Sequence, residues 1–514
     1  MRGGLKQVRL TSIRDPDAAQ HDWRLGALAM STLLSAAIVW FVFGYGYIED
    51  DAFIHLEFAR SVADGSGFSF NGHVVYGDTA PLWVLILVGI HSLGLGWIAS
   101  AKLACAGGLA ATLAGAWRLG RELAALRPFP QEQPAEGACP DRHTGKLVSG
   151  LPAAAVLVTL LNPYLVHWSF SGMEAVSALG LTFWIIALGV VARPSARRIL
   201  CAALLIAVAP LLRPELLLLE AIVAPVLLWR IWQHLQARPV ATRLPVLAAA
   251  AIVMAAPLAV WSSYALHTFG ALVPNTNLAK RGGGLRELVP RMLSVYAVGF
   301  PLTLLFFALV APRLLRLRIP LAIAVMLLWP LGCIVFYLAN HTVVQTRYVL
   351  ISMPTMSIAL LWLIGRMKGR RPLIAAAGSM AAAGALVVAL IVVPHVANKV
   401  RYVQLLSRVA GYLRDTIPPH EPVAIFAIGQ VAFESRHPLV DIGGITDRSV
   451  LPYIGSPVQT CQWARAHGAR YYISGDSPQT GAEPVFTATA PFIGWTFRHS
   501  QYSTRQPLVI YRLP

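Results

Sequence analysis

The stretch that decides the fold is Tyr45-Gly-Tyr-Ile-Glu-Asp-Asp-Ala-Phe-Ile-His-Leu-Glu-Phe-Ala-Arg60, which follows the first long apolar segment of the chain. Three consecutive acids, Glu49, Asp50 and Asp51, stand where a membrane helix would leave the bilayer. Carboxylates at a membrane boundary are costly unless they face water, a partner or a substrate. Because aromatic and apolar residues continue on both sides, we expect the acids to lie in a structured, amphipathic surface.

Composition places the whole chain in a membrane. Of its 514 residues, 56% are hydrophobic and only 13% are charged, and the mean hydropathy is +0.60. These values are typical of a polytopic membrane protein. The net charge of +18 is concentrated in short loops between apolar segments, so membrane topology explains it better than nucleic acid does. The five cysteines have no metal-binding spacing, and a disulfide framework is not expected.

The apolar segments predict about 11 membrane spans. They lie near residues 25–45, 98–117, 149–168, 174–192, 198–212, 214–229, 244–267, 293–312, 319–339, 348–365 and 372–394. Residues 1–24 are basic, which places the N-terminus in the cytoplasm. Residues 81–96 are too short to cross, and we interpret them as an interfacial or re-entrant helix. With that choice, most basic loops fall on the cytoplasmic side.

The chain changes character after the last span. We divide it into a cytoplasmic N-terminus (1–24), a transmembrane domain (25–394) whose first outer loop is 45–97, and a C-terminal domain (395–514). In that last domain, Val423-Ala-Ile-Phe-Ala-Ile428 predicts a buried strand, and further strands are expected near 471–473 and 508–513. An odd number of spans places this small α/β domain on the outer, periplasmic side, with the acids of the first loop.

The acid triplet has the chemistry of a reactive centre for sugar transfer from a lipid phosphate. Such a transfer needs a base that takes the proton from the acceptor hydroxyl. A second carboxylate could instead hold a divalent cation (Mg, Mn or Ca), which would neutralise the departing phosphate. Asp50 and Asp51 could therefore serve as base or as metal ligands. The plain alternative is that the triplet only flanks the membrane on its outer side.

Two later motifs offer a cation for a phosphate. Arg213-Pro-Glu215 forms a turn between two apolar segments, and Arg213 could fork onto phosphate oxygens or simply pair with Glu215. The outer loop Pro274-Asn-Thr-Asn-Leu-Ala-Lys-Arg281 concentrates amides and cations, notably Asn275 and Lys280, and could bind phosphate or acceptor sugar. Ordinary loop chemistry is the alternative for the second motif.

Two further motifs lie at the outer ends of predicted spans. His341 and Arg347-Tyr348 form the polar head of one span, where Arg347 could be a phosphate ligand or a helix-end charge. Glu174 lies in a short outer turn before another span, where it could contact substrate or favour the helix start.

Four stretches of the first outer loop form an ordered set: Asp50-Asp-Ala-Phe-Ile-His55, Phe58-Ala-Arg-Ser61, Gly65-x-Gly-Phe-x-Phe-Asn71 and Tyr76-Gly-Asp-Thr-Ala-Pro-Leu-Trp83. They resemble the first outer loop of GT-C glycosyltransferases, most closely the group containing the mycobacterial terminal β-(1→2)-arabinofuranosyltransferase and its bacterial relatives. The later motifs around Glu174, Arg213, Lys280 and Arg347 resemble signatures of that group in the same order.

This resemblance implies an inverting transfer from a polyprenyl-phosphate sugar on the periplasmic face of a bacterial inner membrane, with juxtamembrane helices in the first outer loop. Asp50 matches the first Asp of the family pair and is the expected base, and Asp51 would support it or bind metal. The resemblance adds four residues to the expected substrate-binding set: His55, Tyr76, Thr79 and Trp83.

We therefore expect a multi-spanning GT-C-like glycosyltransferase surrounded by membrane lipids. It would move a sugar, with arabinofuranose as one candidate, to an envelope glycan or lipid. One alternative is a polyprenyl-linked oligosaccharide ligase, in which arginines would dominate the effect of mutation. A lipid or solute transporter is a weaker alternative, because transporters place charged groups at mid-membrane depth.

Overall fold

The computed structural model describes residues 46–126, 150–314, 319–475, 478–491 and 507–514. The predicted N-terminal segment 1–24 and the predicted first span 25–45 lie outside these ranges. The described residues from Tyr47 onward belong to one compact unit.

Six helical segments in the described ranges are long and apolar enough to cross a membrane. They are α4 (Trp97–Ala124), α10 (Leu216–His234), α11 (Val240–Phe269), α15 (Leu321–Ala339), α16 with α17 (Thr346–Leu350 and Met353–Lys368), and the run of α18, η2 and α19 (Arg370–Val387, Val388–Val392 and Val393–Thr416). A seventh crossing is obtained if α13 (Leu285–Gly299) and α14 (Pro301–Leu314), which are bent by 100° at their junction, form one broken span.

Several predicted spans are instead shorter helices, so the structure does not confirm the expected count. The segment 149–168 is divided into α6 (Leu151–Leu160) and α7 (Pro163–Trp168). The break is local: Pro163 cannot donate a helix hydrogen bond, and the Asn162 side chain accepts from the first amides of α7. The segments 174–192 and 198–212 are α8 (Ala175–Ile185) with the π-helix η1 (Ile186–Val191), and α9 (Ala196–Leu212).

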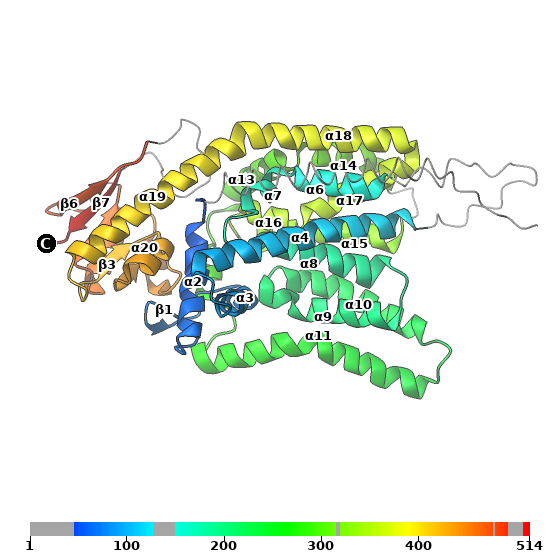
Figure 1. Cartoon of the computed structure of the whole chain (residues 1–514), viewed down its shortest axis with the longest axis horizontal. Helices are drawn as coiled ribbons and strands as arrows, with labels where there is room; N and C mark the ends of the chain where they lie inside the picture. The colour runs from blue at the N-terminus through cyan, green and yellow to red at the C-terminus, as the bar shows by residue number, and fades with distance from the viewer. Residues whose placement is uncertain (1–45, 127–149, 315–318, 476–477, 492–506) are drawn as a thin grey trace, which may run out of the picture. The chain divides into compact units, whose positions relative to one another are not determined.

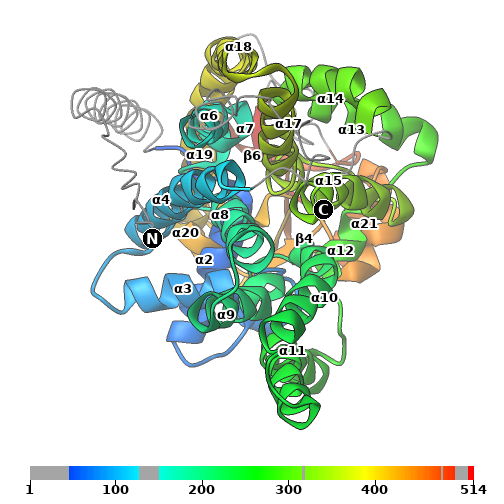
Figure 2. The ribbon, with the colours of Figure 1, turned by 90° about the vertical axis from the view of Figure 1, so that its right-hand side faces the viewer.

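Burial distinguishes a central helix from a peripheral one. The run Thr346–Lys368 is 94% buried along its apolar window, whereas the window of α11 is only 6% buried. Viewed along the bundle in Figure 2, α11 lies at the edge, beside α9 and α10, and α8 lies between α4 and α9. An apolar helix that buries so little of its surface against protein is stabilised by contact with lipid, as expected for a membrane span.

The first outer loop folds into two helices and a hairpin. These are α2 (Asp50–Ala63), β1 (Ser69–Phe70) paired antiparallel with β2 (His73–Val74), and α3 (Pro81–His91). With 11 residues at 1.5 Å per residue, α3 is about 17 Å long, about half the thickness of a bilayer core. Its length agrees with the non-spanning helix expected from the sequence.

Aromatic packing fixes the loop against the membrane helices. Phe68 packs edge-on to Trp261 of α11, and Trp261 Nε1 donates to Tyr76 Oη at 3.0 Å. Tyr76 also stacks on Phe269 at the end of the same helix. The loop is therefore a packed part of the fold, and α2 lies across the ends of the helices next to α20 (Figure 1).

The C-terminal domain is built on a five-stranded sheet of order β4-β3-β5-β7-β6. Its strands are β3 (Val423–Ile425), β4 (Leu439–Asp441), β5 (Tyr471–Ser474), β6 (Glu483–Ala488) and β7 (Leu508–Arg512), and its helices are α20 (Ile428–Ser435), η3 (Arg448–Tyr453) and α21 (Pro457–Ala466). The first three strands run parallel, joined by crossovers through α20 and α21, and β7 is antiparallel to β5 and β6. The three strands predicted from the sequence are β3, β5 and β7.

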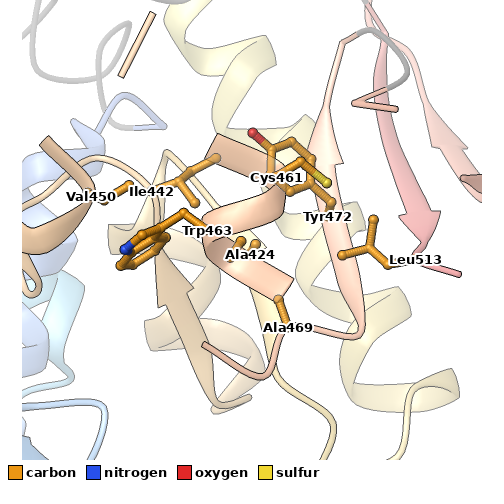
Figure 3. Packing of buried hydrophobic residues seen from close by; sticks show 9 residues of the cluster. Ala424, Ile442, Val450, Cys461, Trp463, Ala469, Tyr472 and Leu513 are labelled. Atoms are coloured by element: carbon orange, nitrogen blue, oxygen red, sulfur yellow. The ribbon is translucent and has the colours of Figure 1, made fainter. Parts of the chain in front are cut away.

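The core of this domain lies between the sheet and α21. Trp463 and Cys461 of α21 pack over Ala424 of β3 and Tyr472 of β5 (Figure 3). The run of α18, η2 and α19 continues through residue 395 into the domain, so the boundary expected at that residue falls within a helix (Figure 1).

Candidate active site

Helix α2 begins with the two adjacent aspartates, and they face different neighbours. Asp50 is 8% exposed, and its carboxylate accepts hydrogen bonds from the backbone amides of Gly429 (3.3 Å) and Gln430 (2.8 Å) at the start of α20. Burial raises the pKa of Asp50 to about 7, against the opposing effect of these two amides. Asp50 therefore joins α2 to the C-terminal domain, and it lines neither of the two cavities at this end of the bundle.

Asp51 faces two cations instead. Its Oδ2 atom lies 2.6 Å from Arg347 Nη2 and 3.9 Å from Lys280 Nζ. Burial favours the neutral acid, but the charges of Arg347 and Lys280 outweigh it and hold the pKa of Asp51 below its usual range. Asp51 is therefore ionised, with 30% of its side chain exposed.

Arg347 is the buried member of this trio. Its side chain is 3% exposed, and its Nε atom has no hydrogen-bond partner among the described residues. A buried guanidinium donor without a partner is costly, and an oxyanion ligand would satisfy it. This unsatisfied donor marks the position in the site where an oxyanion would be bound most favourably.

Two cavities meet at Asp51. The larger has a volume of about 700 Å³ and lies between the membrane helices and the C-terminal domain. The smaller has a volume of about 90 Å³, and its lining includes residues of α2, the loop after β2, the turn before α10, and the head of α16. Four residues line both cavities: Asp51, Lys280, Arg347 and Ile445. A ligand held by the two cations would have access to both.

A chain of buried charges forms the wall of the smaller cavity. Glu174 lies 2.5 Å from Arg213 Nη1 and 3.3 Å from His55 Nε2. His55 Nδ1 lies 2.5 Å from Asp78, and Arg213 Nη2 lies 2.8 Å from Glu215. Since Arg213 already binds two carboxylates, the alternative of a local ion pair describes it better than that of a free phosphate ligand.

These pairs fix the protonation states of the wall. Burial favours neutral His55, but the carboxylates of Asp78 and Glu174 overcome it and raise the pKa of His55 to about 10. Burial also opposes ionisation of Glu174, yet Arg213 and His55 hold its pKa below the usual range. The wall is therefore a set of fixed charges of both signs that can orient a polar ligand.

The structure places the remaining expected residues in two groups. Thr79 and Tyr348 line the smaller cavity. Tyr76 and Trp83 do not line either cavity: Tyr76 belongs to the aromatic packing on α11, and the buried Trp83 donates from Nε1 to the carbonyl of Gly172 at 3.1 Å. These two aromatic residues support the loop.

Two loop residues also lie away from the cavities. The Asn275 side chain donates to the carbonyl of Thr446 at 3.4 Å, and Asn277, rather than Asn275, lines the smaller cavity. His341 is exposed, and its ring lies 3.4 Å from the carbonyl of Gly283. The Asn275–Lys280 motif therefore brings Lys280 and Asn277 to the site, from α12 (Asn275–Ala279) and its end.

A second acid–cation pair, which no motif of the sequence had predicted, lies in the larger cavity. Lys399 Nζ of α19 lies 2.6 Å from Glu49 Oε1. Tyr47 Oη donates to the other Glu49 oxygen and lies 2.9 Å from His167 Nε2. The signal was His395-Val-Ala-Asn-Lys399, a spacing of four that places both residues on one helix face, and both line this cavity.

The residues at the site do not fit a metal centre. Asp51 is paired with Arg347, and Asp50 with backbone amides. Across the described ranges, no three or more His, Cys, Asp or Glu side chains gather as metal ligands would. The positive charges beside Asp51 are those of Arg347 and Lys280.

Comparisons with known proteins agree with this architecture. A family model described as a domain of unknown function, DUF8728, matches residues 395–510. The search of curated proteins gave no match.

Among solved structures, ArnT from Cupriavidus metallidurans bound to undecaprenyl phosphate is similar with a TM-score of 0.57 at 15% identity, covering 95% of this chain and 98% of that one. The apo state of ArnT is similar with a TM-score of 0.56 at 14% identity, covering 96% and 98%. At this identity the likeness shows the fold alone, and it extends over nearly the full length of both chains. The chain thus shares its overall fold with ArnT, and α2 with its paired aspartates lies next to two cation-lined cavities.

Proposed function

We propose that the chain is an inverting membrane glycosyltransferase that takes its sugar from a polyprenyl-phosphate donor. The observation that carries the proposal is the contact of Asp51 with Arg347 and Lys280 at the junction of the two cavities. In such a transfer a proton leaves the acceptor hydroxyl, and negative charge grows on the departing phosphate. An acid beside two cations can serve both changes, because the acid takes the proton and the cations stabilise the charge. The ArnT structure with bound undecaprenyl phosphate supports a lipid phosphate as the donor class.

The donor phosphate binds to Arg347 and Lys280. The buried Nε atom of Arg347 gains an acceptor, which makes a forked contact with phosphate oxygens the natural geometry. The smaller cavity, of about 90 Å³, is lined by charged and polar side chains that suit a sugar. We assign the transferred sugar to this cavity, where the Glu174–Arg213 pair and His55 orient it.

Asp51 then acts as the base. Once the phosphate engages Arg347 and Lys280, their charges are shared with it, and the pKa of Asp51 rises toward its ordinary value. Asp51 accepts the proton of an acceptor hydroxyl that enters from the larger cavity, and the oxygen forms the new bond to the anomeric carbon. The bond from that carbon to the phosphate oxygen breaks, and the lipid phosphate leaves with its charge held by the two cations. Attack from the face opposite the phosphate inverts the anomeric configuration.

The finer assignments rest on the sequence. Basic residues in the expected cytoplasmic loops support a bacterial inner-membrane protein whose N-terminus is cytoplasmic and whose C-terminal domain is periplasmic. The resemblance to arabinofuranosyltransferases makes arabinofuranose the first sugar to test, and an envelope glycan or lipid the acceptor.

The test is consumption of polyprenyl-phosphate arabinose, mannose, glucose and galactose by purified protein, with and without EDTA. We expect one donor to be consumed by the wild type, and not by Asp51→Asn or Arg347→Ala, regardless of EDTA. Arg448→Ala, which removes an exposed arginine of the C-terminal domain, is the matched control and should retain activity. Equal consumption of the donor by the wild type and Asp51→Asn would show that Asp51 is not the base. Loss of activity in EDTA would show that the reaction needs a metal ion.

A further inference from the structure

A short buried turn between α7 and α8, residues 170–173, has four consecutive carbonyl groups that each accept a hydrogen bond from another part of the chain. We call it the 170–173 turn. Its carbonyls accept, in order, from Lys102 Nζ (2.6 Å), the backbone amide of Glu49 (2.9 Å), Trp83 Nε1 (3.1 Å) and Cys105 Sγ (3.6 Å). These donors belong to α4, to the residue before α2, and to α3. The turn therefore ties three elements together.

The 170–173 turn lies directly against the start of α2. Gly172 has a φ of +86°, and a Cβ atom on it would lie 2.7 Å from the Cβ atom of Ala52. This backbone conformation favours glycine, and the close contact leaves no room for a larger residue. A shift of α2 relative to the turn would therefore break contacts on both segments.

Lys102 donates to both of these segments. It lies near the start of α4 and is 3% exposed, and its ammonium group donates to the carbonyl of Phe170 in the turn and to that of Tyr47 just before α2. An ammonium group has three donors, so it can bridge two carbonyls. A charge within an apolar helix is costly unless it has such partners. Lys102 thus joins the start of α2 to the 170–173 turn.

Arg347 contacts the same two segments. Its Nη2 atom lies 2.6 Å from Asp51 of α2, and its Nη1 atom lies 4.0 Å from Met173 Sδ of the turn. Glu174, which follows the turn, forms the buried pair with Arg213. The spacing between α2 and the turn therefore determines how the proposed base, the proposed phosphate ligand and the wall of the smaller cavity lie relative to one another.

We propose that Lys102 is a positioning residue, which holds α2 against the 170–173 turn so that Asp51 meets Arg347 in the geometry that transfer requires. The inference rests on the proposed function, because it takes Asp51 as the base. Lys102 lines neither of the two cavities, so it acts through α2 and not on a ligand. A displacement of about 1 Å can cost about 100-fold in rate. Loss of Lys102 should lower kcat more than donor affinity, since Arg347 and Lys280 belong to other elements.

The experiment compares the wild type with Lys102→Met, which removes the donor, and Lys102→Arg, which keeps a charged donor. Lys368→Met, which removes an exposed lysine at the end of α17, is the control. Turnover of the polyprenyl-phosphate sugar that the wild type consumes gives kcat, and titration with the same donor gives its dissociation constant. We expect kcat to fall about tenfold or more in Lys102→Met, with the dissociation constant within about threefold of the wild type. Lys102→Arg should recover part of the rate, and the control should match the wild type.

Two results would overturn the inference. One is an unchanged kcat in Lys102→Met. The other is a loss of kcat and of donor binding by the same factor, which would mean that Lys102 only keeps the protein folded. Should Lys102→Met fail to fold in thermal unfolding, Lys102→Gln takes its place, because its amide keeps a donor for one carbonyl. The same separation of kcat from donor affinity is then expected, at several-fold.

Hydrogen exchange separates this inference from the proposed function. The Glu49 amide, which donates to the Ser171 carbonyl, reports without any turnover whether α2 still lies on the turn. We expect faster exchange in the peptide that contains Glu49 in Lys102→Met, with exchange in the C-terminal sheet unchanged. If the wild type consumes no donor, the proposed function fails, and this local exchange still decides whether Lys102 holds α2. Unchanged exchange at Glu49 overturns the inference and leaves the proposed function standing.

Discussion

Arg347 Nη2 lies 2.6 Å from Asp51 Oδ2, although 296 residues separate the two in the chain. One side chain comes from the first helix after the first predicted span, and the other from the head of a late, deeply buried span. The contact joins an early segment and a late segment of the membrane domain, at the point where the two cavities meet.

Arg347→Ala should weaken donor binding at least 100-fold, because it removes the buried guanidinium proposed to hold the phosphate. Arg347→Lys keeps the charge but loses the fork, and should recover only part of the affinity. Titration of polyprenyl phosphate, monitored by calorimetry, measures both. Arg281→Ala, which removes an exposed cation next to Lys280, is the matched control. Unchanged affinity in Arg347→Ala would place the phosphate elsewhere.

Comparing Asp51→Asn with Asp50→Asn should show which aspartate acts as the base and which one only holds the fold together. Loss of a general base costs about 10²- to 10⁴-fold in rate, so Asp51→Asn should lower kcat by at least 100-fold. It should not weaken donor binding, because Arg347 loses its competing carboxylate. Asp50→Asn should keep kcat within about tenfold, since its amide oxygen can still accept from Gln430 at the start of α20, while the weaker contact with Gly429 is lost. A larger loss of kcat in Asp50→Asn than in Asp51→Asn would instead identify Asp50 as the base.

The pKa of Asp50 predicts a pH-dependent stability. In the unfolded chain this acid titrates near its ordinary value of 3.8, and in the fold near 7. Between these values the folded state binds more protons, so stability falls as pH rises from about 4 to about 7 and is level above that. Asp50→Asn does not titrate. Its melting temperature should therefore rise relative to the wild type as pH increases across this range, and a constant difference would argue against the raised pKa.

The Glu174–Arg213 pair should be structural. Removing one partner of a buried ion pair costs about 3–5 kcal/mol, because it leaves the other charge uncompensated. We therefore expect Arg213→Ala to be strongly destabilised in thermal unfolding, and the double variant Arg213→Met with Glu174→Gln to recover part of the loss.

The control for this pair is Arg414→Ala, which breaks the exposed Arg414–Asp415 pair, where both side chains are more than half exposed. Exposed pairs contribute little, so its melting temperature should stay close to that of the wild type. A stable Arg213→Ala protein that has lost donor affinity would instead support the phosphate-ligand alternative for Arg213.

Lys399 should affect binding of the acceptor rather than binding of the donor. It lies in the larger cavity, paired with Glu49 and away from the smaller cavity that we assign to the sugar. Lys399→Ala should raise the KM for acceptor several-fold while the donor dissociation constant stays unchanged. Arg401→Ala on the same helix, at a position that does not line either cavity, serves as the comparison. A change in donor affinity alone would contradict this division of the site.

Local patterns in the sequence determined the class of the protein and the order of its parts. Hydropathy depends on each segment alone, so it predicted a helical membrane protein, and the strands β3, β5 and β7 followed from their apolar runs. The short length of 81–96 predicted a helix too short to span, and α3 has 11 residues. Where polar or proline residues interrupt apolar segments, as at Asn162-Pro163, the same reasoning predicted one span where the structure has two short helices.

Only the tertiary structure decided which side chains meet. Asp50 and Asp51 are adjacent, and a helix turns about 100° per residue, so one points to the amides of α20 and the other to Arg347. No local pattern distinguishes them, because their partners lie hundreds of residues away. For the same reason Lys399 and Ile445 were missed: each enters the site only when α20 of the C-terminal domain packs against both α19 and α2. The sequence alone determined that charged groups would gather outside the membrane helices, and long-range packing determined which of them share a cavity.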